Sequence, residues 1–328
     1  MNYRTLGKTG LKISELSLGT WQVGGKWGSG FDEKNAETII NEAIDKGINF
    51  IDTADVYENR QSERTVGKII RSRKEEVYIA TKCGRFIDPH TNANYQAKAL
   101  REYVEQSLKN TGLERIDLIQ LHCPPTEVYY RQEIFEEFEK LKTEGKIAHL
   151  GVSVEKVEEA LKAIEYPNVC TVQIIFNMFR HRPAELFFQE AKKRNIGIIA
   201  RVPLASGLLS GKYNAATTFG SGDHRHFNRK GEAFDQGETF SGIDYNLGLE
   251  AAEKIKSIFP QDLALANIAL KWILMFEEVS CVIPGISKLN HLHANLETLN
   301  IRPISNQEMK AVEEVYNELI RPSVHHRW

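Results

Sequence analysis

Eight short runs rich in β-branched residues recur along the chain, and this repetition limits the folds that it can adopt. The runs cover residues 16–19, 50–53, 77–81, 118–121, 149–153, 172–175, 198–202 and 281–283. Amphipathic segments typical of helices lie between them, at 36–46, 95–110, 134–143, 157–164 and 184–194. Strands that alternate with helices favour a parallel sheet. Eight such units predict an α/β fold, a closed (β/α)8 TIM barrel rather than an open doubly wound sheet.

Four glycines stand between a helical segment and the next strand: Gly47, Gly112, Gly145 and Gly197. Glycine adopts the left-handed backbone conformation at little cost, so it commonly ends a helix. We therefore expect helices to end at these four positions.

Two segments do not follow the repeat. Residues 3–14 predict an N-terminal β-hairpin that turns at residues 8–10 and lies across one end of the barrel. Residues 213–244 are polar and glycine-rich and follow the seventh strand. A loop of this length is usually functional or disordered. The sequence has no linker that would divide it, so we expect a single domain over residues 1–328.

The composition weighs against several classes of protein. The net charge is −2 without a long run of one sign, which argues against a nucleic-acid-binding surface and a basic membrane patch. The polar beginning of the chain does not resemble a signal peptide, and no apolar stretch approaches the roughly 20 residues that span a bilayer. The cysteines, at positions 83, 123, 170 and 281, are scattered. This favours reduced thiols in a cytoplasmic enzyme over disulfides or a zinc site, and we expect no metal.

Polar side chains end three successive strands of the predicted barrel. Asp52 ends the second strand and Tyr57 lies in its loop, Lys82 ends the third strand, and His122 ends the fourth. In TIM barrels, catalytic residues come from the C-terminal ends of several strands. We therefore expect an acid, a phenol, an amine and an imidazole to meet at one end of the barrel.

These four groups make chemical sense together. A phenol has an ordinary pKa of about 10, and the ammonium of Lys82 would lower the pKa of Tyr57 by stabilising the phenolate. Asp52 would keep Lys82 charged and oriented, and His122 would orient a substrate carbonyl or relay a proton. Two other interpretations stay open: the Asp52–Lys82 pair is purely structural, or Lys82 forms a Schiff base with a carbonyl substrate.

The sequence resembles the aldo-keto reductase superfamily over almost its whole length. The resemblance rests on LGTW (18–21), FIDTADVY (50–57), QSE (61–63), ATK (80–82), LIQLHCP (118–124), GKIAHLGVS (145–153), PLASGLLSGKY (203–213) and VIPGISKLNHLHAN (282–295). It is more similar to the bacterial branch related to potassium-channel β subunits than to the aldose-reductase branch. The resemblance implies an (α/β)8 barrel that reduces carbonyls with NADPH by direct hydride transfer. It also implies a catalytic tetrad, with Tyr57 as general acid: Asp52, Tyr57, Lys82 and His122.

The resemblance also implies where NADPH binds. The first strand end supplies Gly19, Thr20 and Trp21, while Ser153 and Gln173 hold the nicotinamide amide. The nicotinamide and pyrophosphate are lined by Arg201, Val202, Pro203, Leu204 and Ser206. The segment that matches the adenosine site contributes Gly285, Ser287, His291 and Asn295. A ribose 2′-phosphate is dianionic, so Lys212 and Arg225 near Ser287 and His291 favour NADP(H) over NAD(H).

Four positions depart from the pattern of the family. Arg201 stands where many relatives place an aromatic ring against the nicotinamide. Its charge should disfavour the cationic oxidised ring, so we expect a shifted ratio of NADP+ to NADPH affinity. Val154 replaces a common asparagine, His291 replaces a glutamine near the adenosine, and Glu58 replaces the glycine after the catalytic tyrosine.

The substrate is predicted only as a class. Trp21, Trp27, Tyr129 and Tyr130 are expected to line an aromatic mouth beside Tyr57 and His122, and the tail RPSVHHRW (321–328) to fold over that mouth or dock at a partner. A small aldehyde or α-hydroxycarbonyl fits best. Two alternatives remain: a regulatory subunit that senses NADPH with slow turnover, and a Schiff-base aldolase that uses Lys82. The sequence leaves open whether the protein is a monomer or a homo-oligomer.

Overall fold

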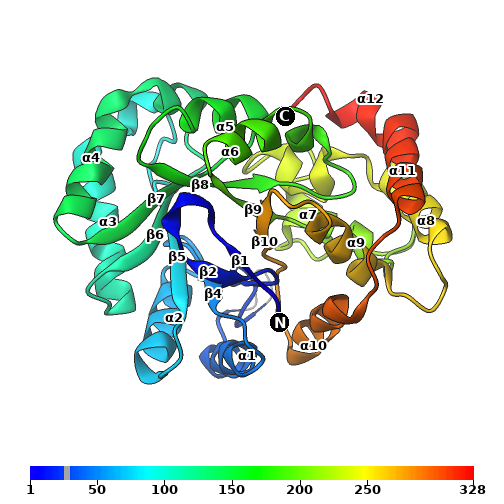
Figure 1. Cartoon of the computed structure of the whole chain (residues 1–328), viewed down its shortest axis with the longest axis horizontal. Helices are drawn as coiled ribbons and strands as arrows, with labels where there is room; N and C mark the ends of the chain where they lie inside the picture. Colours follow the sequence, from blue (N-terminus) through cyan, green and yellow to red (C-terminus); the bar gives the residue numbers. More distant parts are fainter. Residues whose placement is uncertain (26–29) are drawn as a thin grey trace.

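The computed structural model describes residues 1–25 and 30–328. A parallel sheet of eight strands forms the centre, in the order β10-β9-β8-β7-β6-β5-β4-β3 (Figure 1). The strands are β3 (Leu18–Gly19), β4 (Phe50–Asp52), β5 (Tyr78–Cys83), β6 (Ile116–His122), β7 (Ile147–Ser153), β8 (Val169–Ile175), β9 (Gly197–Arg201) and β10 (Val279–Val282). Each lies within a few residues of a predicted run.

The sheet curls until its two edges meet. Parallel bridges join Leu16 to Val282 and Gly19 to Gly285, and the Gly19 amide donates to the Pro284 carbonyl at 3.3 Å. These bonds link β3 to β10, so the predicted (β/α)8 barrel is confirmed.

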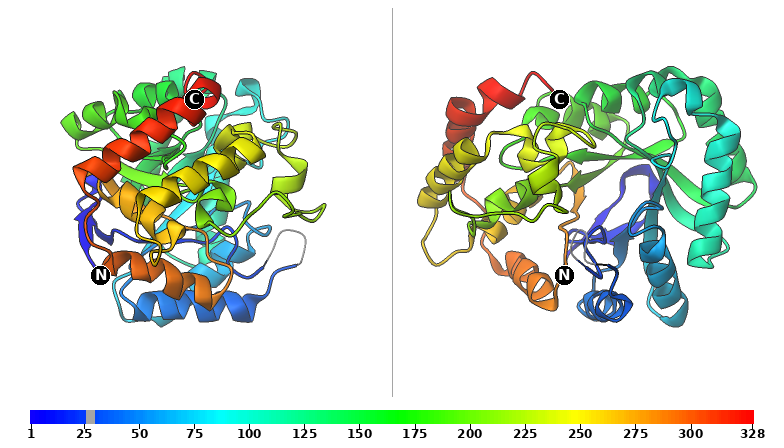
Figure 2. Two further views of the ribbon diagram at one scale, coloured as in Figure 1. Left: turned by 90° about the vertical axis from the view of Figure 1, so that its right-hand side faces the viewer. Right: turned by 180° about the vertical axis from the view of Figure 1, so that it is seen from behind.

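Helices surround the sheet, as Figures 1 and 2 show. They are α1 (Glu33–Asp45), α2 (Gln61–Ser72), α3 (Ala97–Thr111), α4 (Gln132–Thr143), α5 (Val157–Ala163), α6 (Phe187–Lys193), α7 (His224–Phe227), α8 (Tyr245–Ile258), α9 (Leu265–Leu274), α10 (Leu289–Leu296), α11 (Asn306–Val315) and α12 (Arg321–Val324). Within the part of the chain described, no helix combines the length and apolarity needed to span a membrane.

The predicted N-terminal hairpin is present as β1 (Tyr3–Thr5) and β2 (Lys12–Ser14). Leu6 and Ile13 pack with the barrel residues Phe50, Ala80, Leu118, Ile199, Cys281 and Ile283. Arg4 donates hydrogen bonds to the carbonyl groups of Leu274, Phe276 and Val279, just before and at the start of β10. The hairpin therefore closes the N-terminal end of the barrel and leaves the C-terminal end for the functional site.

Three of the four predicted helix stops are correct. Gly47, Gly112 and Gly145 have φ values of 88°, 66° and 75°. Gly197 is the exception, because it is the first residue of β9 and the left-handed residue before it is Asn195, with φ 51°. A Cβ atom at Gly197 would lie 2.6 Å from the Leu6 side chain, so this glycine permits close packing of the hairpin.

The long segment after β9 folds over the C-terminal end without adding a strand. It contains α7 and short turns at Gln236–Glu238 and Phe240–Gly242, and it leads into α8. α11 then runs beside α8 (Figure 2). The predicted long loop after the seventh strand is therefore confirmed.

Candidate active site

Lys82 joins Asp52 and Tyr57 at the C-terminal end of the barrel. Its Nζ atom lies 2.5 Å from Asp52 Oδ1, 2.8 Å from the Thr53 carbonyl oxygen and 3.2 Å from the Tyr57 hydroxyl. The exposed fractions of Lys82 and Asp52 are 1% and 2%. Charges so deep in a barrel are stable only when they are paired and hydrogen-bonded, and here both conditions hold.

Two glutamine amides hold the second oxygen of Asp52. Gln173 Nε2 donates to Asp52 Oδ2 at 2.7 Å, and Gln120 Nε2 donates to the same atom at 3.2 Å. Gln173 therefore helps to hold Asp52 in addition to the nicotinamide role that the resemblance implies. Sequence reasoning missed Gln120, although a polar side chain within the buried strand that precedes His122 was a signal for it.

The ionisation of this cluster differs in part from the expectation. Burial lowers the pKa of Lys82, but the charges of Asp52 and Tyr57 outweigh burial, so the pKa lies above its ordinary value. Burial also raises the pKa of Tyr57, and the neighbouring ammonium opposes this shift without reversing it. The predicted lowering effect of Lys82 on the pKa of Tyr57 is therefore present, but desolvation is the larger effect, so the pKa of Tyr57 lies above its ordinary value. Tyr57 keeps its proton at neutral pH.

His122 completes the predicted tetrad. Its ring lies edge-on to the ring of Tyr57, with 6.1 Å between centroids. Burial, with the charges of Lys82, Arg85 and Arg201, holds the pKa of His122 well below its ordinary value. The imidazole is therefore neutral, which suits a hydrogen-bond donor that orients a carbonyl better than a relay through an imidazolium ion.

The turn after Tyr57 has an unusual backbone. Glu58, Asn59 and Arg60 have φ values of 44°, 49° and 72°, in the left-handed region that costs energy for residues other than glycine. Glu58 thus adopts at a cost the kind of conformation that a glycine would adopt freely. The strained turn leads from Tyr57 directly into α2.

Trp21 lies over the tyrosine as expected, and the long loop adds further rings. The Trp21 and Tyr57 rings are 6.4 Å apart and stacked, and Trp21 lies 5.2 Å from the His224 ring and 6.5 Å from that of Phe234. His224 and Phe234 were not predicted, because nothing local indicates which loop residues reach the barrel. The predicted Trp27 lies outside the described residues.

Tyr129 is not part of the mouth, contrary to the prediction. It is fully buried, and its hydroxyl donates to the Ser153 carbonyl at 3.3 Å. The short turn Thr126–Tyr130 directs Tyr129 inward and leaves Tyr130 outside, 66% exposed, beside Lys162. Ser153 itself lies buried at the end of β7, as expected.

The backbone at the end of β3 lies very close to the backbone just after β10. A Cβ atom at Gly19 would lie 3.1 Å from the Ile283 carbonyl oxygen, so only glycine fits without displacement beside Gly285. Thr20 Oγ1 donates to the Asp52 carbonyl at 3.0 Å and accepts from the Ser62 hydroxyl at 2.8 Å. The Gly19–Thr20 backbone is thus fixed beside Asp52.

Arg201 lies at the end of β9 within a cluster of charged groups. Its guanidinium donates to Glu155 Oε2 at 2.8 Å and to the Val154 carbonyl at 3.0 Å, and it lies 3.7 Å from Glu238. Arg85 lies 3.8 Å from the same Glu238 oxygen. The Arg201 charge predicted beside the nicotinamide is therefore compensated by the Glu155 carboxylate, and Val154 contributes only its backbone carbonyl.

The segment after Arg201 turns sharply. Val202, Ala205 and Ser206 have φ values of 52°, 46° and 55°. The Ser206 hydroxyl donates to the Glu238 carbonyl at 2.9 Å and accepts from the Phe240 amide at 3.0 Å. The predicted residue Ser206 therefore bonds directly to the long loop.

The predicted phosphate-binding residues are brought together only in part. Ser287 Oγ lies 3.3 Å from His291 Nδ1, and the charges of Lys212 and Lys288 act on His291. Ser287 and Lys288 also line a cavity of about 310 Å³ with Gly24, Gly25, Gly30, Asp32 and Asn35. Arg225 bonds instead to Asp223 and Tyr213 within the loop. Asn295 is buried in α10.

One cluster has the spacing of metal ligands. Ligand atoms of Cys123, Glu155 and Glu238 lie within 4.8 Å of one another. The guanidinium groups of Arg201 and Arg85 lie beside these carboxylates. Two fixed positive charges oppose a cation there, so the expectation that catalysis needs no metal stands as a prediction.

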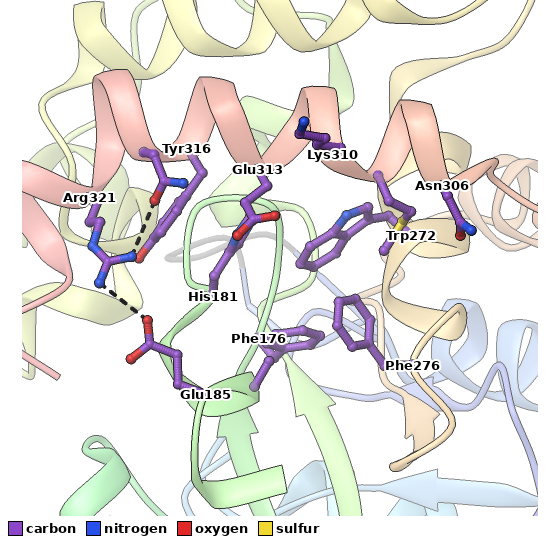
Figure 3. A pocket seen from close by; sticks show the side chains of 13 residues that line it. Phe176, His181, Glu185, Trp272, Phe276, Asn306, Lys310, Glu313, Tyr316 and Arg321 are labelled. Atoms are coloured by element: carbon purple, nitrogen blue, oxygen red, sulfur yellow. Dashed lines mark hydrogen bonds and ion pairs between the residues drawn. The ribbon is translucent and has the colours of Figure 1, made fainter. Parts of the chain in front are cut away.

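A larger cavity lies away from the tetrad. It has a volume of about 410 Å³ between α11 and the barrel, and Phe176, His181, Trp272, Phe276 and Tyr316 form its aromatic wall (Figure 3). The rings of His181 and Tyr316 stack at 3.8 Å, and Arg321 reaches Glu185 across its edge. None of the tetrad residues lines it, so it is not the active site.

Comparison with known proteins agrees with this site. The Aldo/keto reductase family profile matches residues 15–317. Among curated relatives, the uncharacterized oxidoreductase YqkF of Bacillus subtilis (strain 168) is 31% identical over 95% of this chain and 96% of its own length. A probable voltage-gated potassium channel subunit beta of Arabidopsis thaliana is 27% identical over 93% of both chains. Aldo-keto reductase yakc of Schizosaccharomyces pombe, whose name specifies NADP(+), is 25% identical over 92% of this chain and 88% of its own.

Solved structures show the same architecture. The holo form of aldo-keto reductase AKR11C1 from Bacillus halodurans is similar with a TM-score of 0.78 and 25% identity, over 96% of both chains. The family profile covers the strands that carry Asp52, Lys82 and His122, and the relatives include both bacterial reductases and a channel β subunit. The chain is therefore an oxidoreductase of the Aldo/keto reductase family.

Proposed function

We propose that this protein reduces a small aldehyde or ketone to an alcohol with NADPH as the hydride donor. The contact that carries the proposal is the one from Lys82 to both Asp52 and Tyr57, at 2.5 Å and 3.2 Å. It joins a proton donor to a charged, oriented ammonium inside a buried site.

His122, Tyr57 and Lys82 have separate roles in the proposed reaction. Bound NADPH supplies a hydride to the carbonyl carbon. His122 donates a hydrogen bond that orients the carbonyl oxygen, and Tyr57 gives its proton to that oxygen as the alcohol forms. Lys82 then stabilises the phenolate left on Tyr57 until a proton from solvent restores the phenol.

Two features of the chain support binding of NADPH. Arg201 begins the segment that the resemblance assigns to the nicotinamide and pyrophosphate, and its charge acts on the tetrad residue His122. Lys212 and Lys288 place positive charge near His291, which lies beside Ser287, as a 2′-phosphate requires.

The two alternatives receive less support. A Schiff-base aldolase needs an uncharged lysine amine. Asp52 and Tyr57 instead raise the pKa of Lys82, so the amine stays protonated. A sensor with slow turnover would not need a complete tetrad, and here all four residues meet.

Titration with NADPH and NADH, followed by assays of NADPH oxidation against a panel of small aldehydes and α-hydroxycarbonyls, tests the proposal. We expect tighter binding of NADPH than of NADH and turnover with part of the panel. Tight binding without turnover would favour the sensor. Absence of binding would refute the proposal, and borohydride trapping of Lys82 with substrate would then be the next test.

A further inference from the structure

Trp328 packs against the middle of the long loop. It is 4% exposed, and its indole Nε1 donates to Asp235 Oδ1 at 2.8 Å. The same oxygen accepts from the Gly237 amide at 2.7 Å. Cβ atoms at Gly237 and Gly242 would lie 3.0 Å and 2.3 Å from the indole. This part of the loop is therefore shaped to receive a ring, and Trp328 fixes the turn that starts at Asp235.

Arg180 connects Trp328 to the interior. Its guanidinium carbon lies 4.1 Å from the centre of the Trp328 ring. The same guanidinium donates to the carbonyls of Ser241 and Glu155, each at 3.5 Å, and Arg180 is 4% exposed. Arg327 stacks on the indole at 4.2 Å and also bonds Gln236. Cation–π contacts and hydrogen bonds thus hold Trp328 and the loop as one unit.

On its other side, the loop segment contacts Arg201 and Ser206, two of the residues that we propose to line NADPH. Ser206 bonds to the backbone of Glu238 and Phe240, and the Glu238 carboxyl lies 3.7 Å from Arg201. Residues 235–242 therefore form a layer, called here the loop layer. Trp328 lies on its outer side, and Arg201 and Ser206 lie on its inner side.

We infer that Trp328 is a positioning residue for cofactor binding. Through Asp235 it holds the loop layer in place, and the loop layer keeps Glu238 beside Arg201 and Ser206. The inference rests on the proposed function, because it requires that residues 201–206 line NADPH. Trp328 acts on the loop rather than on the reacting atoms, so its loss should alter the residence of NADPH more than the chemical step.

Trp328→Phe tests this, because it keeps an aromatic ring but removes the indole N–H together with the five-membered ring. A hydrogen bond to a carboxylate contributes enough that its loss should raise the dissociation rate of NADPH about fivefold in stopped-flow fluorescence. The single-turnover rate of reduction with bound NADPH should change less than about twofold. Trp272→Phe is the matched control: Trp272 is also buried, and its indole N–H has no hydrogen-bond partner among the described residues. It should leave NADPH dissociation unchanged.

Substitutions in the loop layer test whether Trp328 acts through Asp235 and Glu238. Asp235→Asn keeps an acceptor oxygen and should behave like the wild type. Asp235→Ala also removes the acceptor of the Gly237 amide, so it should release NADPH at least as fast as Trp328→Phe. If Trp328 acts through Glu238, combining Trp328→Phe with Glu238→Gln should release NADPH no faster than the faster single variant. If the two substitutions instead multiply their effects on the NADPH dissociation rate, Trp328 does not act through Glu238.

The outcomes separate the two proposals. If the wild type binds NADPH and Trp328→Phe releases it at the wild-type rate, this inference is overturned and the proposed function stands. If the wild type does not bind NADPH, both are overturned. Hydrogen exchange at the amides of 235–242 provides a second check, because Trp328→Phe should speed exchange there and Trp272→Phe should not.

Discussion

The ammonium of Lys82 lies 2.5 Å from the carboxylate of Asp52, and neither side chain reaches solvent. A buried ion pair is costly to break, because removal of one partner leaves the other charge uncompensated. The pair therefore ties the stability of the barrel to the residues that we propose as catalytic.

Lys82→Met should lower the free energy of unfolding by roughly 3–5 kcal/mol, because it leaves Asp52 charged and unpaired. Urea denaturation at neutral pH measures this loss. Lys68→Met is the control, since Lys68 is 58% exposed and pairs with Glu33 and Glu37 at the surface. Equal stability of the two variants would show that the Asp52–Lys82 pair is not a stabilising interaction.

Tyr57→Phe should lower kcat/KM for carbonyl reduction by about 10²–10⁴, the usual contribution of a general acid. The dissociation constant of NADPH should change less than about twofold, because the hydroxyl acts on the carbonyl oxygen. Tyr166→Phe, on the outer side of the barrel against Phe135, serves as the control. Near-normal turnover of Tyr57→Phe would mean that another group donates the proton.

Ionisation of the buried Asp55 should lower the stability of the protein as the pH rises. Burial, with the nearby charge of Glu63, raises the pKa of Asp55 to about 8, and neither carboxyl oxygen has a hydrogen-bond partner among the described residues. In the unfolded chain an aspartate titrates near 3.9, so between about pH 4 and pH 8 the folded state binds more protons and stability falls as pH rises.

Asp55→Asn removes this titration. The unfolding free energy of the wild type should fall by on the order of 4 kcal/mol relative to that of the variant between about pH 5 and about pH 9. Urea denaturation at both pH values measures this fall, with the exposed Asp262→Asn as control. The same wild-type-to-variant difference at both pH values would refute a buried, protonated Asp55.

Glu155 should set the preference between the two cofactor forms. Its carboxylate lies 2.8 Å from Arg201, and this guanidinium holds the pKa of Glu155 below its ordinary value against the effect of burial. Glu155→Gln removes that compensation, so the bare Arg201 charge should repel the cationic nicotinamide of NADP+. We expect the dissociation constant of NADP+ to rise about tenfold more than that of NADPH.

Fluorescence titration of both cofactor forms measures this ratio. Arg201→Gln should shift it in the opposite direction, and Glu165→Gln, a surface variant paired with Lys162, should not shift it. An unchanged ratio in Glu155→Gln would show that Arg201 does not lie near the nicotinamide ring.

The sequence predicted the barrel and its tetrad because both follow from local patterns. β-branched runs that alternate with amphipathic segments define parallel strands, and parallel strands bring their C-terminal ends to one edge. Asp52, Lys82 and His122 therefore had to meet. The predicted helix stop at Gly197 was wrong because, in the sequence, any glycine before a strand resembles a helix stop.

Only the tertiary structure decided which groups contact one another across the barrel. Gln173 reaches Asp52 from 121 positions away, Trp328 holds Asp235 from 93 positions away, and Tyr129 turns inward to Ser153. The shift in the pKa of Tyr57 depends likewise on the balance between burial and the Lys82 charge. These contacts follow from the strand register and from the path of the long loop. The sequence did not predict them, because the periodicity of a single segment determines neither the register nor the path.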